Sequence, residues 1–400
     1  MKTPALIAPR QRDRPAAPVT PHSTPRALRI LTSTVVLARA GGIELSTYQD
    51  GASLVRRGHR VDVLYGHDGS QRAEFADAGI RVTGPFVFGF SPRGALRDVL
   101  AFWPAARAAR KLRPDILWLN RPEHIIWAQF VARWARVPIV CHLHHAPNYR
   151  RPRLLSTGVA HFIAVSEHTR QQWIASGIQA ERITVVHNSI ALEAYPFGGP
   201  TELEGARTSL QLSRTTPVVL YYGRLTAEKG VVTLLRAWGK RVREGKPGQL
   251  VLVGLRMPES EPEVERELAS LPAESYRWYP EQSDVVSFLH ASDVVVLPTT
   301  ANESFGRVVI EALATGRPVI GSRVGGIPEI LSGSMSRFLV SPGDADDLAE
   351  RIESVLGWRD ADPGLAATCH QWVADHFPYD QHIARVEDVL ARHSKRGSRA

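Results

Sequence analysis

The sequence contains only two cysteines in 400 residues, Cys141 and Cys369, and they lie far apart. Two distant cysteines form neither a disulfide framework nor a cysteine-rich zinc site, and so few of them fit a reducing compartment. No stretch approaches the roughly 18 uninterrupted apolar residues that a membrane-spanning helix needs. We therefore expect a cytoplasmic protein without a membrane span.

The N-terminus also lacks the continuous apolar segment of a secretory signal peptide. Its proline and arginine content predicts a disordered, basic leader over residues 1–27. The rest of the chain is too long for one typical core, so two domains are the default expectation. The whole sequence has 44% hydrophobic and 22% charged residues, which is the composition of an ordinary globular protein.

The net charge of +9 is unevenly distributed along the chain. Residues 1–29 carry +5 and residues 391–400 carry +4, whereas residues 30–190 carry +9 and residues 191–390 carry −9. A basic first half suits an anionic partner, such as a phosphorylated acceptor or a membrane surface. An attraction between two oppositely charged lobes is an equal alternative. Nucleic acid is not expected, because the basic residues are not interleaved with aromatic residues on one element.

Strand and helix patterns alternate along the chain, beginning with an apolar strand at 27–36, an amphipathic helix at 43–58 and the strand "RVDVLYG". Such βαβ units imply parallel sheets, and nearly continuous apolar strands indicate sheets that are buried on both faces. The alternation stops in a polar, acidic stretch and then restarts. We predict an α/β protein whose parts after the leader are an N-terminal Rossmann-like domain over 28–190, a linker over 191–216, a C-terminal Rossmann-like domain over 217–370 and a C-terminal helix over 371–395, with a return to the N-terminal domain as one option for that helix.

Two cations follow the first strand of the second half, in "YYGRLTAEKG" (221–230). Arg224 and Lys229 lie in the loop after this strand, and Gly230 starts the next helix. Ligands of open α/β sheets bind beyond the carboxyl ends of the strands, where a helix N-terminus adds a favourable dipole for anions. The two side chains are candidates for binding a phosphate or diphosphate, with ordinary surface charges as the alternative.

The segment "ESFGRVVIE" (303–311) follows a second buried strand, "DVVVLP", and has a glutamate at each end. We predict a helix over residues 305–315 with Ser304 as its N-cap. Glu303 then precedes the helix, and Glu311 lies one to two turns inside it, at the flank of the apolar face.

The spacing in this segment suits the length of a nucleotide. The amide groups of Phe305 and Gly306 are free to bind phosphate. Glu311 follows Gly306 by roughly 7.5 Å along the helix axis, a reasonable distance from a diphosphate to the ribose of the same nucleotide. Glu303 would face the sugar. A glycosidase pair fits poorly, because an eight-residue helical offset of roughly 12 Å exceeds the carboxyl separation of about 5 to 9.5 Å in glycosidases.

The motif "GRLTAEKG", followed about 75 residues later by "ESFGRVVIEALATGRPVI" and then "GGIPEI", resembles the retaining nucleotide-sugar glycosyltransferases of family 4. The resemblance runs over most of residues 28–390. It implies the GT-B fold, in which two Rossmann-like, doubly wound parallel-sheet domains face a cleft. It also implies that the first domain binds the acceptor and the second the nucleotide sugar.

The resemblance implies a set of donor-binding residues in the second half, namely Arg224, Lys229, Glu303, Ser304, Phe305, Gly306 and Glu311. Arg224 and Lys229 would neutralise the leaving diphosphate, Glu303 would contact the donor sugar and Glu311 the ribose. In the first half, Gly41 and Gly42 lie between a strand and a helix. They form either a simple tight turn or, as the resemblance implies, a loop whose amides approach the donor.

Three histidines follow a buried strand in "VCHLHHAPNYRRPR". They are not expected to bind zinc, because alternate strand residues point to opposite faces and the three side chains cannot easily converge. Members of the resembled family have a histidine at this strand end that meets the donor sugar. His144 aligns best, with His142 and His145 as alternatives. The predicted catalytic residues are thus Glu303, His144, Arg224 and Lys229.

Arginines of the first half are candidates for binding an anionic acceptor or a membrane surface, namely Arg121, Arg150 and Arg151. Ordinary surface charges are an equal alternative. Asn120 departs from the resembled family, in which many members have a histidine at this position, so the acceptor side of the site is less well defined.

Together these features predict retaining transfer of a sugar from a UDP- or GDP-linked donor to a sugar, lipid-linked or other anionic acceptor, in polysaccharide, glycolipid or other glycoconjugate biosynthesis. No metal is expected, because the Asp-x-Asp spacings at 344–346 and 360–362 are better explained as helix caps. A sugar phosphorylase, a nucleotide-sugar epimerase and a catalytically silent sugar-nucleotide-binding subunit are the alternatives. We expect a cytoplasmic protein that can contact the inner face of the membrane.

Overall fold

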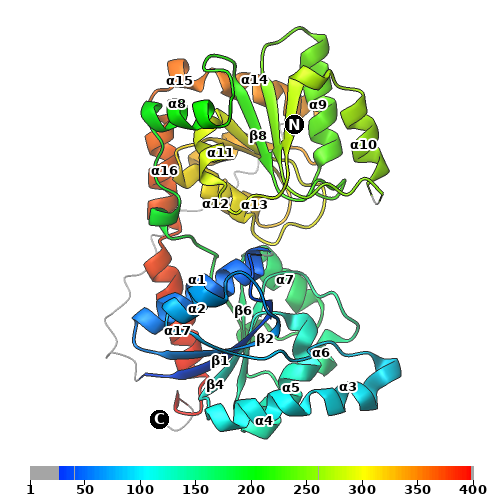
Figure 1. Ribbon diagram of the computed structural model, residues 1–400, viewed down its shortest axis with the longest axis vertical. Coiled ribbons are helices and arrows are strands. Elements are labelled where there is room, and N and C mark those ends of the chain that lie inside the picture. Colours follow the sequence, from blue (N-terminus) through cyan, green and yellow to red (C-terminus); the bar gives the residue numbers. More distant parts are fainter. Residues whose placement is uncertain (1–26, 40, 260, 398–400) are drawn as a thin grey trace, which may run out of the picture.

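The computed structural model describes residues 27–39, 41–259 and 261–397, and these form two lobes, one above the other in Figure 1. The predicted leader, apart from residue 27, lies outside the described residues. Each lobe is built on one parallel sheet, of seven strands in the N-lobe and six in the C-lobe. No helix in the described part of the chain has the length and apolar character needed to cross a membrane.

The N-lobe sheet has the strand order β3-β2-β1-β4-β5-β6-β7, and every neighbouring pair is parallel. Its strands are β1 (Arg29–Val36), β2 (Arg60–His67), β3 (Arg81–Thr83), β4 (Ile116–Leu119), β5 (Ile139–Leu143), β6 (His161–Ala164) and β7 (Ile183–Val185). The helices between them are α1 (Gly42–Arg56), α2 (Arg72–Asp77), α3 (Ala95–Ala101), α4 (Trp103–Leu112), α5 (Ile125–Ala135), α6 (Pro152–Leu155) and α7 (Glu167–Ala175).

The C-lobe sheet has the order β10-β9-β8-β11-β12-β13, again with parallel neighbours throughout. Its strands are β8 (Val218–Tyr222), β9 (Gln249–Val253), β10 (Tyr276–Tyr279), β11 (Val294–Leu297), β12 (Val319–Ser322) and β13 (Leu339–Val340). The remaining helices are α8 (Pro200–Ser209), α9 (Val231–Arg243), α10 (Pro262–Ala269), α11 (Val286–Ala291), α12 (Arg307–Ala314), α13 (Ile327–Ile330), α14 (Ala345–Leu356), α15 (Trp358–Ala361), α16 (Leu365–His376) and α17 (Tyr379–Arg392).

Both faces of the N-lobe sheet are buried, because successive strand residues point to opposite sides. In β4, Leu117 and Leu119 belong to the apolar cluster with α4, α5 and α7. Ile116 and Trp118 of the same strand belong to the cluster with α1 and α17. This arrangement is the one that nearly continuous apolar strands predict.

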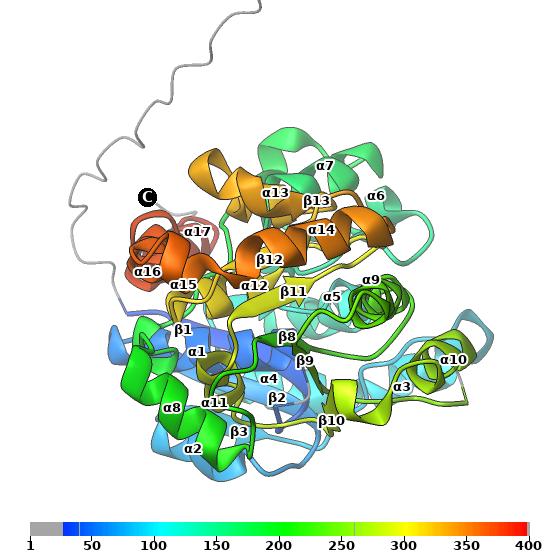
Figure 2. The ribbon, with the colours of Figure 1, turned by 90° about the horizontal axis from the view of Figure 1, so that it is seen from above.

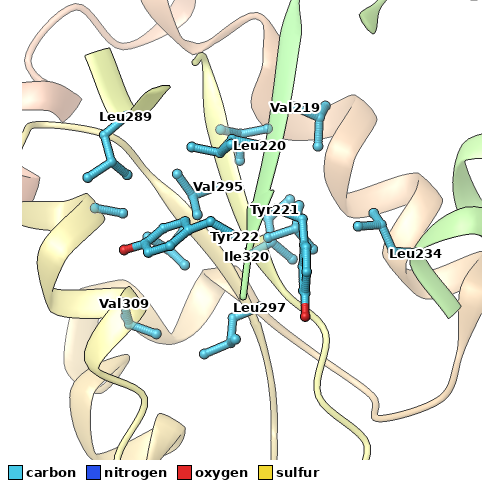
Figure 3. Close-up of a cluster of buried hydrophobic side chains, with 14 of the residues drawn as sticks. Val219, Leu220, Tyr221, Tyr222, Leu234, Leu289, Val295, Leu297, Val309 and Ile320 are labelled. Atoms are coloured by element: carbon cyan, nitrogen blue, oxygen red, sulfur yellow. The ribbon is translucent and has the colours of Figure 1, made fainter. Parts of the chain in front are cut away.

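The C-lobe sheet is likewise enclosed by two layers of helices. Figure 2 shows α8, α11, α12 and α16 on one side of the sheet and α9, α10 and α14 on the other. Consecutive side chains of β8 point to opposite helix layers. Tyr222 points to the side of Val309 in α12, and Tyr221 points to the side of Leu234 in α9 (Figure 3).

Two segments join the lobes in ways that the sequence pattern does not specify. Helix α8, within the predicted linker, packs on α11 and is therefore part of the C-lobe. The predicted boundary at residue 370 falls inside α16, which packs on α12. After Pro378 the chain continues as α17, which packs on α1 of the N-lobe, as Figure 1 shows.

Candidate active site

A cavity of about 570 Å³ lies between the two lobes, at the carboxyl ends of β1 and β8. Both lobes line it, with residues that include Gly41, Gly42, Tyr48 and Gln49 from the N-lobe and Tyr222, Gly223, Asp284, Arg307, Val308 and Glu311 from the C-lobe. Ligands of doubly wound sheets bind beyond the carboxyl ends of the strands, so this cavity is the expected place for one. It brings the two predicted donor-binding glycines opposite Glu311.

Two neighbouring side chains fix Glu311 in the wall of this cavity. Its carboxylate accepts hydrogen bonds from the Tyr222 hydroxyl (2.8 Å) and from Arg307 Nε (2.6 Å). Arg307 also donates to Ser46 Oγ (3.2 Å) and Gln49 Oε1 (2.7 Å) of α1. The same guanidinium therefore orients the carboxylate and connects the C-lobe to the N-lobe.

The protonation states of this group follow from burial and from the charge of Glu311. Burial and the nearby carboxylate raise the pKa of Tyr222 well above its ordinary value, so the hydroxyl stays a donor. Burial acts to lower the pKa of Arg307, but the interactions with Glu311 and Tyr195 together outweigh it and raise that pKa. A carboxylate has about four acceptor positions, so Glu311 keeps some of them for the hydroxyl groups of a ligand.

Tyr222 and Arg307 are absent from the predicted site residues, although each has a signal in the sequence. Tyr222 is the last residue of a buried strand, directly before the motif that contains Arg224. Arg307 precedes Glu311 by four residues, which is the spacing of an ion pair on one helix.

The first residue and the N-cap of α12, which follows the loop after β11, differ from the prediction. Helix α12 starts at Arg307 with Gly306 (φ +95°) as N-cap and without a side-chain cap, so the prediction of Ser304 as N-cap is wrong. The left-handed turn at Gly306 places Ser304 too early in the chain to reach the helix amides. The Ser304 carbonyl instead accepts a hydrogen bond from Ser166 Oγ of the N-lobe (2.5 Å). The Phe305 side chain is buried, so only its backbone can meet a ligand.

The double glycine of "GGIPEI" packs against the backbone of this loop. The amide of Gly326 donates to the Glu303 carbonyl (2.8 Å). Gly325 has φ +62°, and a Cβ atom at this position would lie 1.9 Å from the same carbonyl oxygen. A side chain cannot be accommodated there, because both the backbone conformation and the contact exclude it. The motif thus holds Glu303 in place through backbone contact.

Lys229 and Glu303, which are predicted to meet different parts of a donor, form an ion pair with 2.8 Å between Lys229 Nζ and Glu303 Oε2. Gly230 (φ +74°) allows this approach, because a Cβ atom there would lie 1.8 Å from the Pro298 carbonyl oxygen at the end of β11. Arg224 is exposed, and its guanidinium forms no ion pair with the residues that the structure describes. One cation at the end of β8 is therefore paired and the other is open to an anion.

The predicted donor-binding and catalytic residues fall into two groups. Gly41, Gly42 and Glu311 line the cavity between the lobes. The other group lies on the loops after β8, β11 and β5 and does not line that cavity, and its members are Arg224, Lys229, Glu303, Ser304, Phe305, Gly306 and His144. Helix α12 connects the two groups, since it begins after Gly306 and contains Glu311.

Of the three histidines in β5 and directly after it, His144 is the one open to a ligand. His142 is fully buried, with its ring centroid 4.2 Å from that of His144. His145 Nε2 lies 3.0 Å from Glu123 Oε2 in a hydrogen bond. His144 is partly exposed and forms no hydrogen bond with the described part of the chain. Burial lowers the pKa of His144 to about 3, so its imidazole is neutral and can donate one hydrogen bond and accept another.

The predicted acceptor arginines have different surroundings. The Arg121 guanidinium lies between Glu44 and Glu123, 3.0 Å from Glu123 Oε1. Burial acts to lower the pKa of Arg121, but its hydrogen bonds to the two carboxylates outweigh it and raise that pKa. Arg150 and Arg151 are exposed and form no ion pair with other described residues. Arg121 is therefore fixed, whereas the other two are free to move to a ligand.

Asn120 lies in the interior of the N-lobe and not on an acceptor surface. Its amide nitrogen donates to Thr32 Oγ1 (3.3 Å) and Thr47 Oγ1 (3.0 Å). It therefore connects β1, α1 and β4. Its amide oxygen is buried and has no partner within the described ranges.

The two Asp-x-Asp segments lie at the ends of helices. Asp344 is the N-cap of α14 and accepts hydrogen bonds from the amides of Asp346 and Asp347 (3.0 Å each), as predicted. Asp360 lies in the first turn of α15 and Asp362 is the C-cap residue of that helix, with its carboxylate 3.3 Å from Arg337. Within 27–39, 41–259 and 261–397, no group of three or more His, Cys, Asp or Glu side chains could hold a metal ion.

Both lobes match known sequence families. Residues 40–194 match Glycosyltransferase Family 4, and residues 216–357 match Glycosyl transferases group 1. The D-inositol 3-phosphate glycosyltransferase of Mycobacterium marinum is 35% identical over 184 residues, which cover 44% of this chain but only 37% of that protein. The corresponding protein of Mycolicibacterium smegmatis is 28% identical over 416 residues, which cover 93% of this chain and 92% of that protein.

The fold also matches that of solved structures. The crystal structure of Anabaena Alr3699/HepE in complex with UDP-glucose superposes with a TM-score of 0.79 at 22% identity, over 91% of this chain and 99% of that chain. The chain therefore has the GT-B fold. It belongs to glycosyltransferase family 4, which confirms the resemblance seen in the sequence motifs.

Proposed function

We propose that the protein transfers a sugar from a nucleoside diphosphate donor to an acceptor, with retention of the anomeric configuration and without a metal ion. The observation that carries this proposal is the cavity between the lobes, where Tyr222 and Arg307 fix the Glu311 carboxylate opposite Gly41 and Gly42. A carboxylate held in this way suits the two hydroxyl groups of a ribose, because it can accept a hydrogen bond from each.

The loops next to the cavity would hold the rest of the donor. Gly306 precedes Glu311 by five residues, or roughly 7.5 Å along α12, so amides at the start of this helix can reach the diphosphate of a nucleotide whose ribose meets Glu311. Lys229 and Arg224 would neutralise that diphosphate. Alr3699/HepE binds UDP-glucose, which makes UDP-linked sugars the first donors to test and GDP-linked sugars the second.

The proposed reaction has one exchange of bonds at the anomeric carbon. The bond from this carbon to the diphosphate oxygen breaks, and a bond to the acceptor oxygen forms on the same face of the sugar. The proton of the acceptor hydroxyl passes to the leaving phosphate oxygen. Lys229 and Arg224 stabilise the negative charge on the diphosphate, which is the part that a metal ion would otherwise take. Glu303 and neutral His144 would hydrogen-bond to sugar hydroxyls and orient the ring.

The acceptor would bind to the N-lobe and would be a sugar, a lipid-linked sugar or another anionic molecule. A second cavity, of about 520 Å³, lies at the carboxyl ends of β1 and β2 and is lined by residues that include His67, Phe86, Val87, Phe88 and His124. Its aromatic wall suits a sugar ring or an apolar chain. The proposal includes a role in polysaccharide, glycolipid or other glycoconjugate synthesis in the cytoplasm, with contact at an anionic membrane.

An assay for released nucleoside diphosphate tests this function. Purified protein is incubated with UDP- and GDP-sugars and a panel of acceptors, with and without EDTA, and the configuration of the product is read by NMR. We expect release that requires an acceptor, is insensitive to EDTA and gives a product with the donor's anomeric configuration. Inversion or loss of turnover in EDTA contradicts the mechanism. Sugar phosphate as a product indicates a phosphorylase, and no reaction with any pair indicates a silent subunit.

A further inference from the structure

Large apolar side chains are exposed at one end of the N-lobe. Nine such side chains are exposed in the described part of the chain, and four of them belong to α3, α4 and α5, namely Leu96 (77% exposed), Leu100 (66%), Trp103 (42%) and Trp134 (40%). Figure 1 shows these three helices along the edge of the N-lobe that lies away from the C-lobe. We name the exposed surface of residues 91–136 the α3–α5 face.

The apolar side chains of the α3–α5 face follow the helices in order. Leu96 and Leu100 are four residues apart on α3 and therefore lie on one side of it. Trp103 at the start of α4 packs edge-on against Trp134 of α5, with ring centroids 4.5 Å apart. The two tryptophans thus bridge neighbouring helices while each keeps about two fifths of its surface exposed.

The exposed charges of the α3–α5 face are all positive. Arg107 and Arg110 follow Trp103 by four and seven residues, so they share its side of α4. Further exposed cations on this face are Arg93, Arg97, Lys111, Arg113, Arg133 and Arg136.

Apart from Arg97, which pairs with Asp98 at 3.0 Å, these cations form no ion pair with the described residues. Asp98 is buried next to Arg97, and Asp115 is buried next to Arg29 and Arg396. Glu123 is only partly exposed and is paired with Arg121 and His145. Within residues 91–136, which the structure describes throughout, no acidic side chain is exposed.

We propose that the α3–α5 face docks the protein on an anionic lipid bilayer. Leucine and tryptophan side chains enter the headgroup region of a bilayer readily, and arginines pair with lipid phosphates. Each basic side chain near such a surface adds to the attraction. Because this face lies away from the C-lobe, docking leaves the cavity between the lobes open to the donor. A protein partner or a second copy of the chain is the alternative occupant.

This inference deepens the membrane contact of the proposed function by assigning it a surface. Vesicle binding is measured without sugar transfer, so the failure of one does not imply the failure of the other. The test is co-sedimentation of the full chain with vesicles of phosphatidylcholine, alone or in an equimolar mixture with phosphatidylglycerol. Two double variants change the face: R107E/R110E reverses two charges, and L96S/L100S removes two exposed leucines.

The matched controls change equivalent side chains in the C-lobe. R243E/R266E reverses two exposed arginines that form no ion pair with described residues, and Leu255→Ser removes an exposed leucine (47% exposed). All variants are first checked for the melting temperature of the unmodified protein.

We expect the unmodified chain to bind the anionic vesicles at least about tenfold more tightly than the neutral ones. R107E/R110E should lose at least about tenfold of that affinity and L96S/L100S about as much, whereas both controls bind normally. Equal binding by R107E/R110E and R243E/R266E overturns the proposal, as does the absence of vesicle binding. Analytical ultracentrifugation provides another contradicting outcome. If the unmodified chain is a dimer and L96S/L100S is a monomer, the α3–α5 face binds a second copy of the chain and the proposal is overturned.

Discussion

At Glu311, the Tyr222 hydroxyl and the Arg307 guanidinium hold the carboxylate in one orientation before any ligand arrives. Pre-organised acceptors contribute more to affinity than mobile ones, because the cost of ordering them has already been met during folding.

Removing the hydroxyl in Tyr222→Phe should weaken donor binding by roughly threefold to tenfold, the range expected for one buried hydrogen bond. Isothermal titration calorimetry measures the change. Tyr279→Phe is the matched control, because its hydroxyl also donates one hydrogen bond, to the Leu210 carbonyl at 3.2 Å, but lies outside the cavity lining. Equal affinities for the two variants would show that Tyr222 does not orient Glu311.

His144 provides a second test at the scale of one residue. Burial lowers its pKa to about 3, so the neutral form predominates at pH values above about 4 and the side chain does not titrate near neutrality. The ratio of kcat/KM between the unmodified protein and His144→Ala should therefore be the same at about pH 5.5 and about pH 8. A ratio that changes with a midpoint near the ordinary histidine value of about 6.5 contradicts a neutral His144.

The sequence alone identifies some of the candidate site residues and not others. The sequence limits the candidate histidine to three residues near one strand end. In the folded chain His142 is buried and His145 is hydrogen-bonded to Glu123, which leaves His144. Both features depend on tertiary contacts. The carboxylate at 311 was predictable from its spacing to Gly306. Its partners Tyr222 and Arg307 were not selected, because the β8 strand end and the α1 surface meet it only in the folded chain.

At the scale of elements, central strands such as β4, β8 and β11 were well predicted, since each is a short apolar run buried on both faces. The start of α12 was not. A serine followed by an apolar run is a common helix start, but the left-handed Gly306 takes the N-cap position here. The loop before α12 is set by its contact with the double glycine at 325–326, which comes after the next strand.

Gly325→Ala should displace the loop that holds Glu303. The added Cβ atom meets the Glu303 carbonyl oxygen at 1.9 Å in a backbone conformation of φ +62°, so the loop must shift. We expect kcat to fall by roughly tenfold or more, because misplacement of a catalytic group by about 1 Å is costly. Steady-state kinetics and a thermal melt measure the two effects separately.

Gly205→Ala is the control for this change, because Gly205 lies inside α8 with open space around its Cα. Alanine is favoured over glycine in a helix by about 1 kcal/mol, so this variant should be active and slightly more stable. Full activity in Gly325→Ala would mean that the double glycine does not set the position of Glu303.

At the scale of the whole molecule, contacts between residues far apart in sequence join the lobes. Glu329 of α13 accepts hydrogen bonds from the amides of Glu167 and His168 at the start of α7 (2.8 Å each), and it lies 2.9 Å from His187 Nε2. Helix α17 returns to α1. Contacts between residues so far apart leave no periodic signal in the sequence. The packing of α17 on the N-lobe was therefore predicted only as one option.

The docking of α17 should depend on pH. His382 Nε2 lies 3.2 Å from Asp50 Oδ2 of α1. Burial acts to lower the pKa of His382, but the charge of Asp50 and the hydrogen bonds to Asp50 and to the His187 carbonyl together outweigh it and raise that pKa. A raised folded pKa means that the stabilisation is fully present below the unfolded value of about 6.5 and is lost as the pH rises through the folded value.

The melting temperature of His382→Asn should therefore fall below that of the unmodified protein by roughly 3 °C or more at about pH 6, and the gap should narrow at about pH 9. Differential scanning fluorimetry at both pH values measures it. His376→Asn on the exposed end of α16 is the control and should show no such gap. A gap that widens with rising pH contradicts a charged His382.

The central claim is that a nucleotide sugar binds between the lobes with its ribose on Glu311, and isothermal titration of UDP- and GDP-sugars tests it most directly. Glu350, an exposed glutamate on α14, supplies the matched control. We expect one donor to bind the unmodified protein and Glu350→Ala equally, and Glu311→Ala to bind it roughly tenfold to a hundredfold more weakly. Unchanged affinity in Glu311→Ala, or no binding of any nucleotide sugar, would contradict the claim.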